Sequence, residues 1–312
     1  MKNTLSCLAI VLVSLAGFAQ QDFQMSQYMF HNTTFNPAFY GSGEGIAING
    51  WLRQQWMGFK DDNGKKVAPE TYLFSVDSPL KLLHGGVGGS IFQDKLGFEK
   101  TIGLKLGYAY RTEIGMGNFA GGLMLQLQNM TIDFSKFDPI DGDDPLITKN
   151  RGQKTDMVFD LSLGVFYSSP DRYYAGLSAT NLLQSKGKNT IYRNRRQYHL
   201  TGGYQFVLPS YPAFQIEPSM LFKYDGSVFQ FDLDAVVLYN NKIWGGLGYR
   251  YQDAVVVLAG MYFKDFRIGM AYDIGTSSIR KYNNGSLEVS LGYIFKIETD
   301  RLRKSYRNTR FL

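Results

Sequence analysis

Residues 287–295 read Leu-Glu-Val-Ser-Leu-Gly-Tyr-Ile-Phe, and the pattern of this stretch decides the fold. Every second side chain is large and apolar, whereas most of the positions between them are small or polar. A period of two predicts a β-strand with one apolar face. The outward, apolar set is Leu287, Val289, Leu291, Tyr293 and Phe295, and it alternates with Glu288, Ser290, Gly292 and Ile294.

The same alternation recurs upstream and predicts about fourteen strands, many near the roughly ten residues that a tilted strand needs to cross a bilayer. Aromatic residues at 15%, 34 glycines and only 9 prolines also favour a chain of many strands. The expected strands are 44–56, 69–77, 85–93, 100–112, 117–130, 156–168, 171–182, 197–208, 211–223, 227–239, 242–251, 254–263, 265–274 and 286–296.

When the links between these strands are numbered along the chain, the odd-numbered and even-numbered links differ in length. The long polar links are the first, fifth, seventh and thirteenth (57–68, 131–155, 183–196 and 275–285), whereas the even links are mostly tight, although 78–84 is longer. Outer-membrane barrels have long outer loops and short periplasmic turns. We therefore expect an all-β, up-and-down antiparallel barrel in the outer membrane, with both termini periplasmic. A soluble secreted all-β protein is the alternative. Interfacial aromatics would be Tyr108, Tyr110, Tyr167, Tyr249, Tyr251, Tyr293 and Phe295.

The first residues resemble a secretory signal. Lys2 gives a positive start, 5–15 an apolar core, and Gly17-Phe18-Ala19 a small-x-small site, so we expect cleavage after Ala19. The apolar core is too short for a spanning helix. Cys7, the sole cysteine, lies inside the signal, which excludes disulfides from the mature chain. The net charge of +6 is spread along the chain, which argues against a nucleic-acid site. The expected divisions are 1–19 signal, 20–43 N-terminal plug or docking segment, 44–296 barrel and 297–312 basic periplasmic tail.

The N-terminal segment carries a family resemblance. Residues 24–30 read Gln-Met-Ser-Gln-Tyr-Met-Phe and 35–42 read Phe-Asn-Pro-Ala-Phe-Tyr-Gly-Ser. These two stretches resemble the N-terminal sequences of the PorP/SprF family of the type IX secretion system of Bacteroidetes. Phe39 and Tyr40 stand where that family usually has Tyr and Ala. Trp51 with 53–56, and the final 310–312, are also similar to it. The resemblance implies an outer-membrane barrel that assists export of cargo such as adhesins and contacts other secretion components on the periplasmic side.

Few residues suggest catalysis or a cofactor. His31, His84 and His199 are far apart and form no zinc motif, and His84 and His199 are expected at opposite barrel ends. We expect neither an enzyme nor a cofactor. An acidic stretch at 138–144 fails the EF-hand spacing, and a solvated loop is the simpler interpretation. Its acids are Asp138, Asp141, Asp143 and Asp144.

Three sets of residues are candidate sites. The segment that would plug the barrel or dock a partner contains Gln27, Tyr28, Met29, Phe30, Asn36, Pro37 and Ala38; a simple turn is the alternative for Asn36-Pro37-Ala38. Inward-facing charges of mixed sign could pair across the lumen: Lys105, Arg111, Asp160, Asp232, Asp234, Arg250, Arg267 and Asp273. The basic tail would dock periplasmic proteins through Arg301, Arg303, Lys304, Arg307 and Arg310, or simply be solvated.

Two functions remain open. One is a non-enzymatic secretion component that works through protein contacts. The other is a channel for small hydrophobic solutes of the FadL type, which has a plugged barrel of similar strand number and an Asn-Pro-Ala hatch. A continuous apolar tunnel would favour the channel, whereas a blocked lumen would favour the secretion component.

Overall fold

A computed structural model describes residues 22–61, 63–137, 152–170, 172–190 and 192–296. The stretch that opened the sequence analysis forms strand β15 (Ser286–Lys296), and the predicted faces are confirmed. Leu291 and Phe295 are each 50% exposed on the outer surface, whereas Glu288 and Ser290 are buried in the interior. The outward face is apolar because lipid surrounds it, and the inward face is polar because other polar groups meet it.

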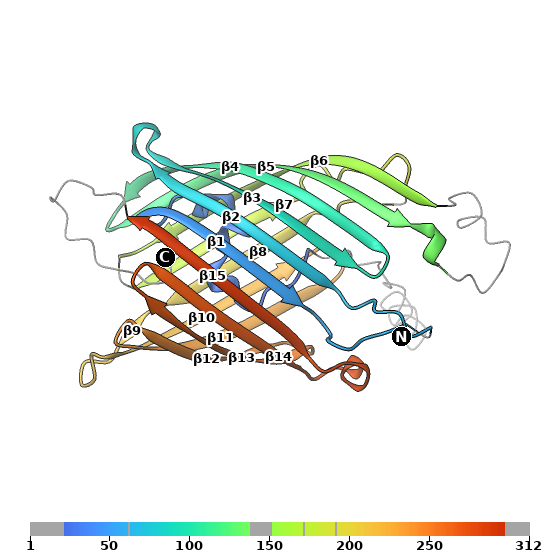
Figure 1. Cartoon of the computed structure of the whole chain (residues 1–312). Coiled ribbons are helices and arrows are strands. Elements are labelled where there is room, and N and C mark those ends of the chain that lie inside the picture. The colour runs from blue at the N-terminus through green and yellow to red at the C-terminus, as the bar shows by residue number, and fades with distance from the viewer. Residues whose placement is uncertain (1–21, 62, 138–151, 171, 191, 297–312) are drawn as a thin grey trace, which may run out of the picture.

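The strands close into a single antiparallel barrel (Figure 1). The last strand pairs with the first, from Gly45 opposite Lys296 to Gln54 opposite Leu287, so no free edge remains at this seam. The described residues form 15 strand segments, and β8 and β9 together make one wall strand, which gives the 14 that the sequence predicts. The strands are β1 Gly45–Gln54, β2 Glu70–Leu80, β3 Gly85–Leu96, β4 Glu99–Ile114, β5 Gly117–Asp133, β6 Gln153–Ser168, β7 Tyr173–Thr180, β8 Gln197–Tyr204, β9 Phe206–Val207, β10 Phe214–Tyr224, β11 Phe229–Tyr239, β12 Ile243–Arg250, β13 Ala254–Phe263, β14 Phe266–Gly275 and β15.

The interruption between β8 and β9 has a local cause. Gly203 pairs with Ser219 and Phe206 pairs with Ile216, so both segments keep one register against β10. Pro218 of β10 falls opposite the interruption, and proline has no N–H to donate to a ladder. The expected strand 197–208 is therefore split rather than wrong.

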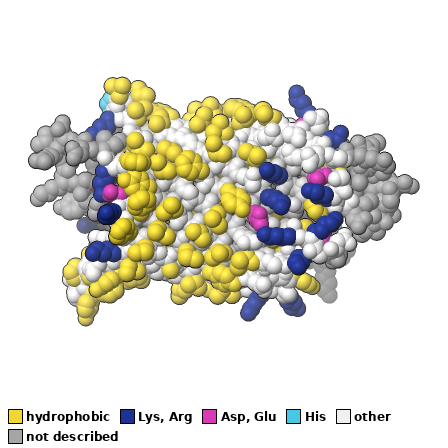
Figure 2. Space-filling view, in the orientation of Figure 1, with side chains coloured by type: hydrophobic (Ala, Val, Ile, Leu, Met, Phe, Trp, Pro, Cys, Tyr) yellow, Lys and Arg dark blue, Asp and Glu magenta, His cyan; other side chains and the backbone are white. Residues whose placement is uncertain are grey.

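The two ends of the barrel differ as the parity of the links predicts. We call the end with links 55–69, 134–152, 181–196 and 276–285 the long-link end, and the end at which β1 begins and β15 finishes the short-link end. Between them, hydrophobic side chains cover much of the visible face, with Lys and Arg gathered toward the ends (Figure 2). This distribution fits an apolar membrane layer between two aqueous sides.

The described helices are all short 3₁₀ turns. None of them is long or apolar enough to span a membrane. The first three lie within residues 22–43, which we call the N-terminal segment. The helices are η1 Tyr28–Phe30, η2 Asn32–Thr34, η3 Pro37–Phe39, η4 Lys81–Leu83, η5 Phe134–Lys136 and η6 Ser278–Tyr282.

Candidate functional site

The N-terminal segment lies inside the barrel (Figure 1). Its last helical turn begins where the sequence dictates, because Asn36 accepts a hydrogen bond from the Ala38 amide at 3.0 Å and Pro37 occupies the first helical position. All seven residues that the sequence singles out for this segment are buried: Gln27, Tyr28, Met29, Phe30, Asn36, Pro37 and Ala38.

The segment runs through the lumen from one end to the other. Asp22 and Phe23 lie beside Trp56 at the long-link end. Gly41, in contrast, reaches Asp77 at the short-link end, where its amide donates to the carboxylate at 3.0 Å. The described chain therefore starts at one end of the barrel and finishes at Lys296 at the other. The termini themselves, and with them the expectation that both are periplasmic, lie outside the described residues.

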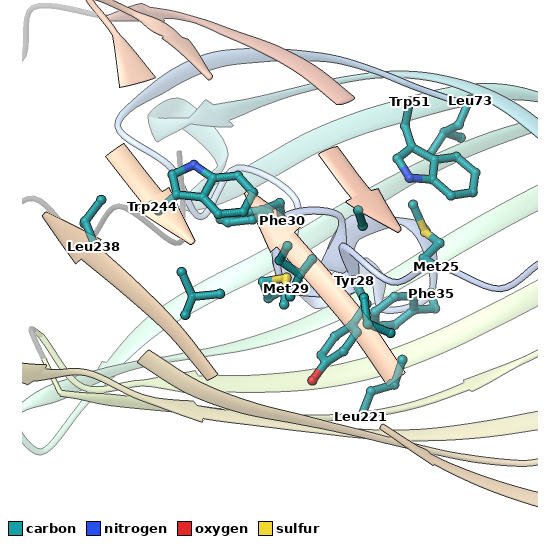
Figure 3. Packing of buried hydrophobic residues seen from close by; sticks show 14 of the residues in the cluster. Met25, Tyr28, Met29, Phe30, Phe35, Trp51, Leu73, Leu221, Leu238 and Trp244 are labelled. Atoms are coloured by element: carbon teal, nitrogen blue, oxygen red, sulfur yellow. The ribbon is translucent and has the colours of Figure 1, made fainter. Parts of the chain in front are cut away.

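Much of the apolar core is formed between this segment and the inner wall (Figure 3). Phe30 packs on Trp244 with ring centroids 4.9 Å apart, and Phe23 packs on Trp51 at 5.8 Å. The interior of a barrel this wide needs such filling, because its own wall side chains leave space at the centre. The segment supplies the missing apolar volume.

Glycines in the wall let the segment approach closely. A Cβ on Gly164 would lie 2.1 Å from Asn36 Oδ1, and one on Gly122 would lie 2.4 Å from the Ala38 amide nitrogen. Because no side chain intervenes at these glycines, Asn36 Nδ2 can donate a hydrogen bond to the backbone carbonyl of Val165 at 3.1 Å. The Asn36-Pro37-Ala38 motif therefore packs closely against glycines of β5 and β6.

A buried ionic network holds the beginning of the segment. Arg53 contacts Glu288 at 2.5 Å and Asp273 at 2.8 Å. Arg250 contacts Asp273 at 2.8 Å and Asp232 at 2.9 Å. All five side chains are at most 5% exposed. We call Arg53, Asp232, Arg250, Asp273 and Glu288 the lumen network.

Ser26 of the segment sits at the centre of the lumen network. Its hydroxyl donates to Asp273 at 2.6 Å and accepts from both Arg250, at 2.9 Å, and Arg53, at 3.2 Å. Its amide and that of Gln27 donate to Glu288 at 2.6 and 3.0 Å. Two cations face three carboxylates, so these backbone donors compensate the surplus negative charge.

The sequence identifies three members of the network and misses two. Asp232, Arg250 and Asp273 were predicted as inward charges that could pair across the lumen, and they do meet. Arg53 and Glu288 were not, although both occupy inward positions of the alternation. Ser26 carried no signal, because a serine ahead of any periodic pattern does not reveal its partners.

The other predicted lumen charges form no ion pair with this network among the described residues. Lys105 donates to the Thr34 carbonyl at 3.0 Å, and Arg267 donates to Asn49 at 2.9 Å and lies over the Phe30 ring at 4.6 Å. Several of these charges bind the segment or a link rather than one another. Arg111 donates to the carbonyls of Tyr40 and Gly41, Asp160 accepts from Leu183 and Ser185 of a long link and from Asn194, and Asp234 is buried beside Gly248.

Titratable groups of the segment are affected by their burial. Burial, together with the nearby Arg267 cation, holds the pKa of His31 well below its ordinary value. Burial, and then the Asp77 carboxylate, raises the pKa of the Tyr40 hydroxyl. His31 therefore packs as a neutral ring, 6.4 Å from the ring of Trp51.

No catalytic or metal-binding constellation is seen within the described residues. His199 stacks on Phe35 at 5.4 Å, whereas His84 lies in the turn between η4 and β3. No group of three or more His, Cys, Asp or Glu side chains in the described ranges could hold a metal ion. The expected signal, the acidic stretch 138–144 and the tail residues Arg301, Arg303, Lys304, Arg307 and Arg310 fall outside the described residues.

Solved structures share the architecture. The toluene transporter TbuX of Ralstonia pickettii is similar with a TM-score of 0.54 and 11% identity, over 88% of this chain and 94% of that one. The toluene transporter TodX of P. putida gives 0.52 and 11%, over 88% and 95%, and the monoaromatic hydrocarbon channel CymD gives 0.52 and 10%, over 93% and 97%. At these identities the likeness concerns the fold alone. No curated protein matches the sequence significantly.

A family model gives the decisive match. The model described as type IX secretion system membrane protein PorP/SprF matches residues 17–293, which include the N-terminal segment and nearly all of the barrel. This extent agrees with the resemblance carried by residues 24–30 and 35–42. The chain belongs to the PorP/SprF family of type IX secretion system membrane proteins.

Proposed function

We propose that this barrel is a non-enzymatic outer-membrane component of the type IX secretion system. It assists the export or surface anchoring of specific cargo, such as adhesins, through protein contacts. Other components of the system would bind it from the periplasm. The family match supports the secretion assignment, and the rest of the proposal concerns how the molecule works.

The observation that carries the proposal is the docking of the N-terminal segment on the lumen network. Ser26 alone makes hydrogen bonds with four of its charged side chains, all buried. Breaking such contacts exposes unpaired buried charges, which is strongly unfavourable. We infer that the segment plugs the barrel, so that the molecule presents two rigid ends to partners instead of an open pore.

Deletion of residues 20–43 tests this role. We expect the shortened chain to enter the outer membrane but to lose export of its cargo, measured as cargo on the cell surface. Exchange of Met116 for Ser, a very exposed residue in a short turn, serves as a control that leaves export unchanged. Normal export by the deletion variant would refute the role of the segment.

A channel for small hydrophobic solutes is the alternative function. The fold that this chain shares with toluene transporters makes the comparison worth an experiment. In a liposome-swelling assay we expect little solute flux through the intact protein and more through the variant lacking residues 20–43. Robust flux through the intact protein would favour the channel.

The basic tail is the proposed periplasmic docking element. Opposite charge attracts partners and sets the rate of encounter. We expect charge reversal at Arg301, Arg303, Lys304, Arg307 and Arg310 to reduce co-purification of periplasmic secretion components. Unchanged co-purification would mean that the tail is merely solvated.

A further inference from the structure

A cavity of about 600 Å³ opens at the long-link end of the barrel. The start of the N-terminal segment forms part of it through Asp22, Phe23 and Gln24. Gln24 is fixed there, because its side-chain oxygen accepts hydrogen bonds from Lys223 and Gln230, each at 3.0 Å. The N-terminal segment therefore contributes a fixed polar group to the cavity.

The lining combines aromatic rings with carboxylates. Its rings are Phe23, Trp56, Phe229 and Tyr251, and its acids are Asp22, Asp94 and Asp253. None of the described residues that line it is Lys or Arg. Gln24, Gln55, Gln230 and Gln252 add amide groups that can both donate and accept hydrogen bonds.

Two lining residues adopt backbone conformations that non-glycine residues rarely take. Trp56 has a φ of 50° and Gln252 a φ of 59°. The Trp56 amide is held by a hydrogen bond to the Ser286 hydroxyl at 3.1 Å. For a bulky residue such as Trp56 this conformation is costly, whereas Gln252 lies in the tight turn between β12 and β13. Both residues border the same cavity.

We propose that this cavity binds a cationic, aromatic-containing segment of polypeptide. The carboxylates would attract Lys or Arg side chains, the rings would stack on guanidinium groups and aromatic side chains, and the glutamines would pair with the peptide backbone. The inference rests on the proposed secretion function and deepens it by naming the chemistry of the partner that the long-link end accepts.

A polypeptide fits the lining better than a carbohydrate. Aromatic rings and carboxylates also occur in sugar sites, but a neutral sugar gains nothing from a net charge. Three acids at one opening, with no Lys or Arg among the described lining residues, favour a cation. Asp253 forms an ion pair with Arg250 at 3.5 Å, but its side chain is 40% exposed and still borders the opening.

The test uses the purified full-length protein in detergent and a short fluorescein-labelled peptide of repeated Gly-Arg-Tyr units. We expect this peptide to bind, and its counterpart with Glu in place of Arg not to bind. The double variant Asp22→Asn with Asp94→Asn should weaken binding about tenfold, because two ion pairs are lost. The matched control is Asp265→Asn, which removes an acid at the short-link end and should leave binding unchanged.

Trp56 gives a second measurement on the unaltered protein. Of the three tryptophans, Trp51 and Trp244 are buried, so a peptide in the cavity should change the emission of Trp56 alone. The change should vanish in Trp56→Phe. Equal binding of the Glu peptide, equal weakening by Asp265→Asn, or binding of a neutral oligosaccharide but not of the Arg peptide would overturn the inference. If the peptide fails to bind while deletion of 20–43 still abolishes export, only the cavity inference fails.

Discussion

At the scale of single residues, the lumen network is the most sensitive part of the molecule. Arg250→Met would leave Asp232 without its ion-pair partner in the interior and remove one of the two cations of Asp273. Removing one partner from a buried charge pair costs about 3–5 kcal/mol. We expect the urea midpoint of unfolding in lipid vesicles to fall accordingly.

Lys242→Met is the matched control for this substitution, because Lys242 is exposed at the short-link end. It should change the free energy of unfolding by less than about 0.5 kcal/mol. A small effect of Arg250→Met, comparable with that of the control, would show that the network is hydrated and of little importance to stability.

His31 makes docking of the segment depend on pH. Its pKa is well below the ordinary value of about 6.5 when the segment is docked, so below pH 6.5 the undocked state takes up a proton that the docked state excludes. Docking is therefore strongest above pH 6.5 and weakens by up to about 1.4 kcal/mol per pH unit below it.

Hydrogen-exchange protection of residues 25–35, corrected for intrinsic rates, measures this dependence. The variant His31→Gln should lose most of it, which separates His31 from His84 and His199. An unchanged pH dependence in His31→Gln would assign the effect to other groups.

At the scale of elements, the two adjacent glycines of β5 provide a matched pair. A methyl group on Gly122 would collide with the Ala38 amide at 2.4 Å, whereas one on Gly121 meets nothing within 4 Å. We expect Gly122→Ala to displace Pro37 and Ala38 and to raise their hydrogen exchange and protease sensitivity. Gly121→Ala should leave both unchanged. Equal behaviour of the two variants would contradict the close contact between η3 and the wall.

The strands could be predicted from sequence far better than the segment. A period of two is imposed on every wall strand by lipid on one side and polar groups on the other, so it is visible in stretches such as 287–295. The segment has no period, because each of its residues meets a different part of the interior. Its path is set by contacts as distant in sequence as Ser26 with Asp273, and such pairings leave no local trace.

At the scale of the whole molecule, the two ends of the barrel should face opposite sides of the membrane. The only cysteine is Cys7 in the expected signal, so single cysteines can be introduced without background. We expect Gln252→Cys, at the long-link end, to react with a membrane-impermeant maleimide on intact cells. Asp265→Cys, at the short-link end, should react only after the outer membrane is opened. The reverse pattern would invert the orientation, and equal labelling would argue against a transmembrane position.

The closed seam between β1 and β15 has a consequence for assembly. The segment passes through the ring of strands from the long-link end to the start of β1, so in the finished barrel it is threaded. Strands that close around a chain already lying among them face no threading barrier, whereas a closed ring would have to reopen to admit it. The wall strands should therefore assemble around the N-terminal segment, and the pairing of the last strand with the first should be the step that encloses it.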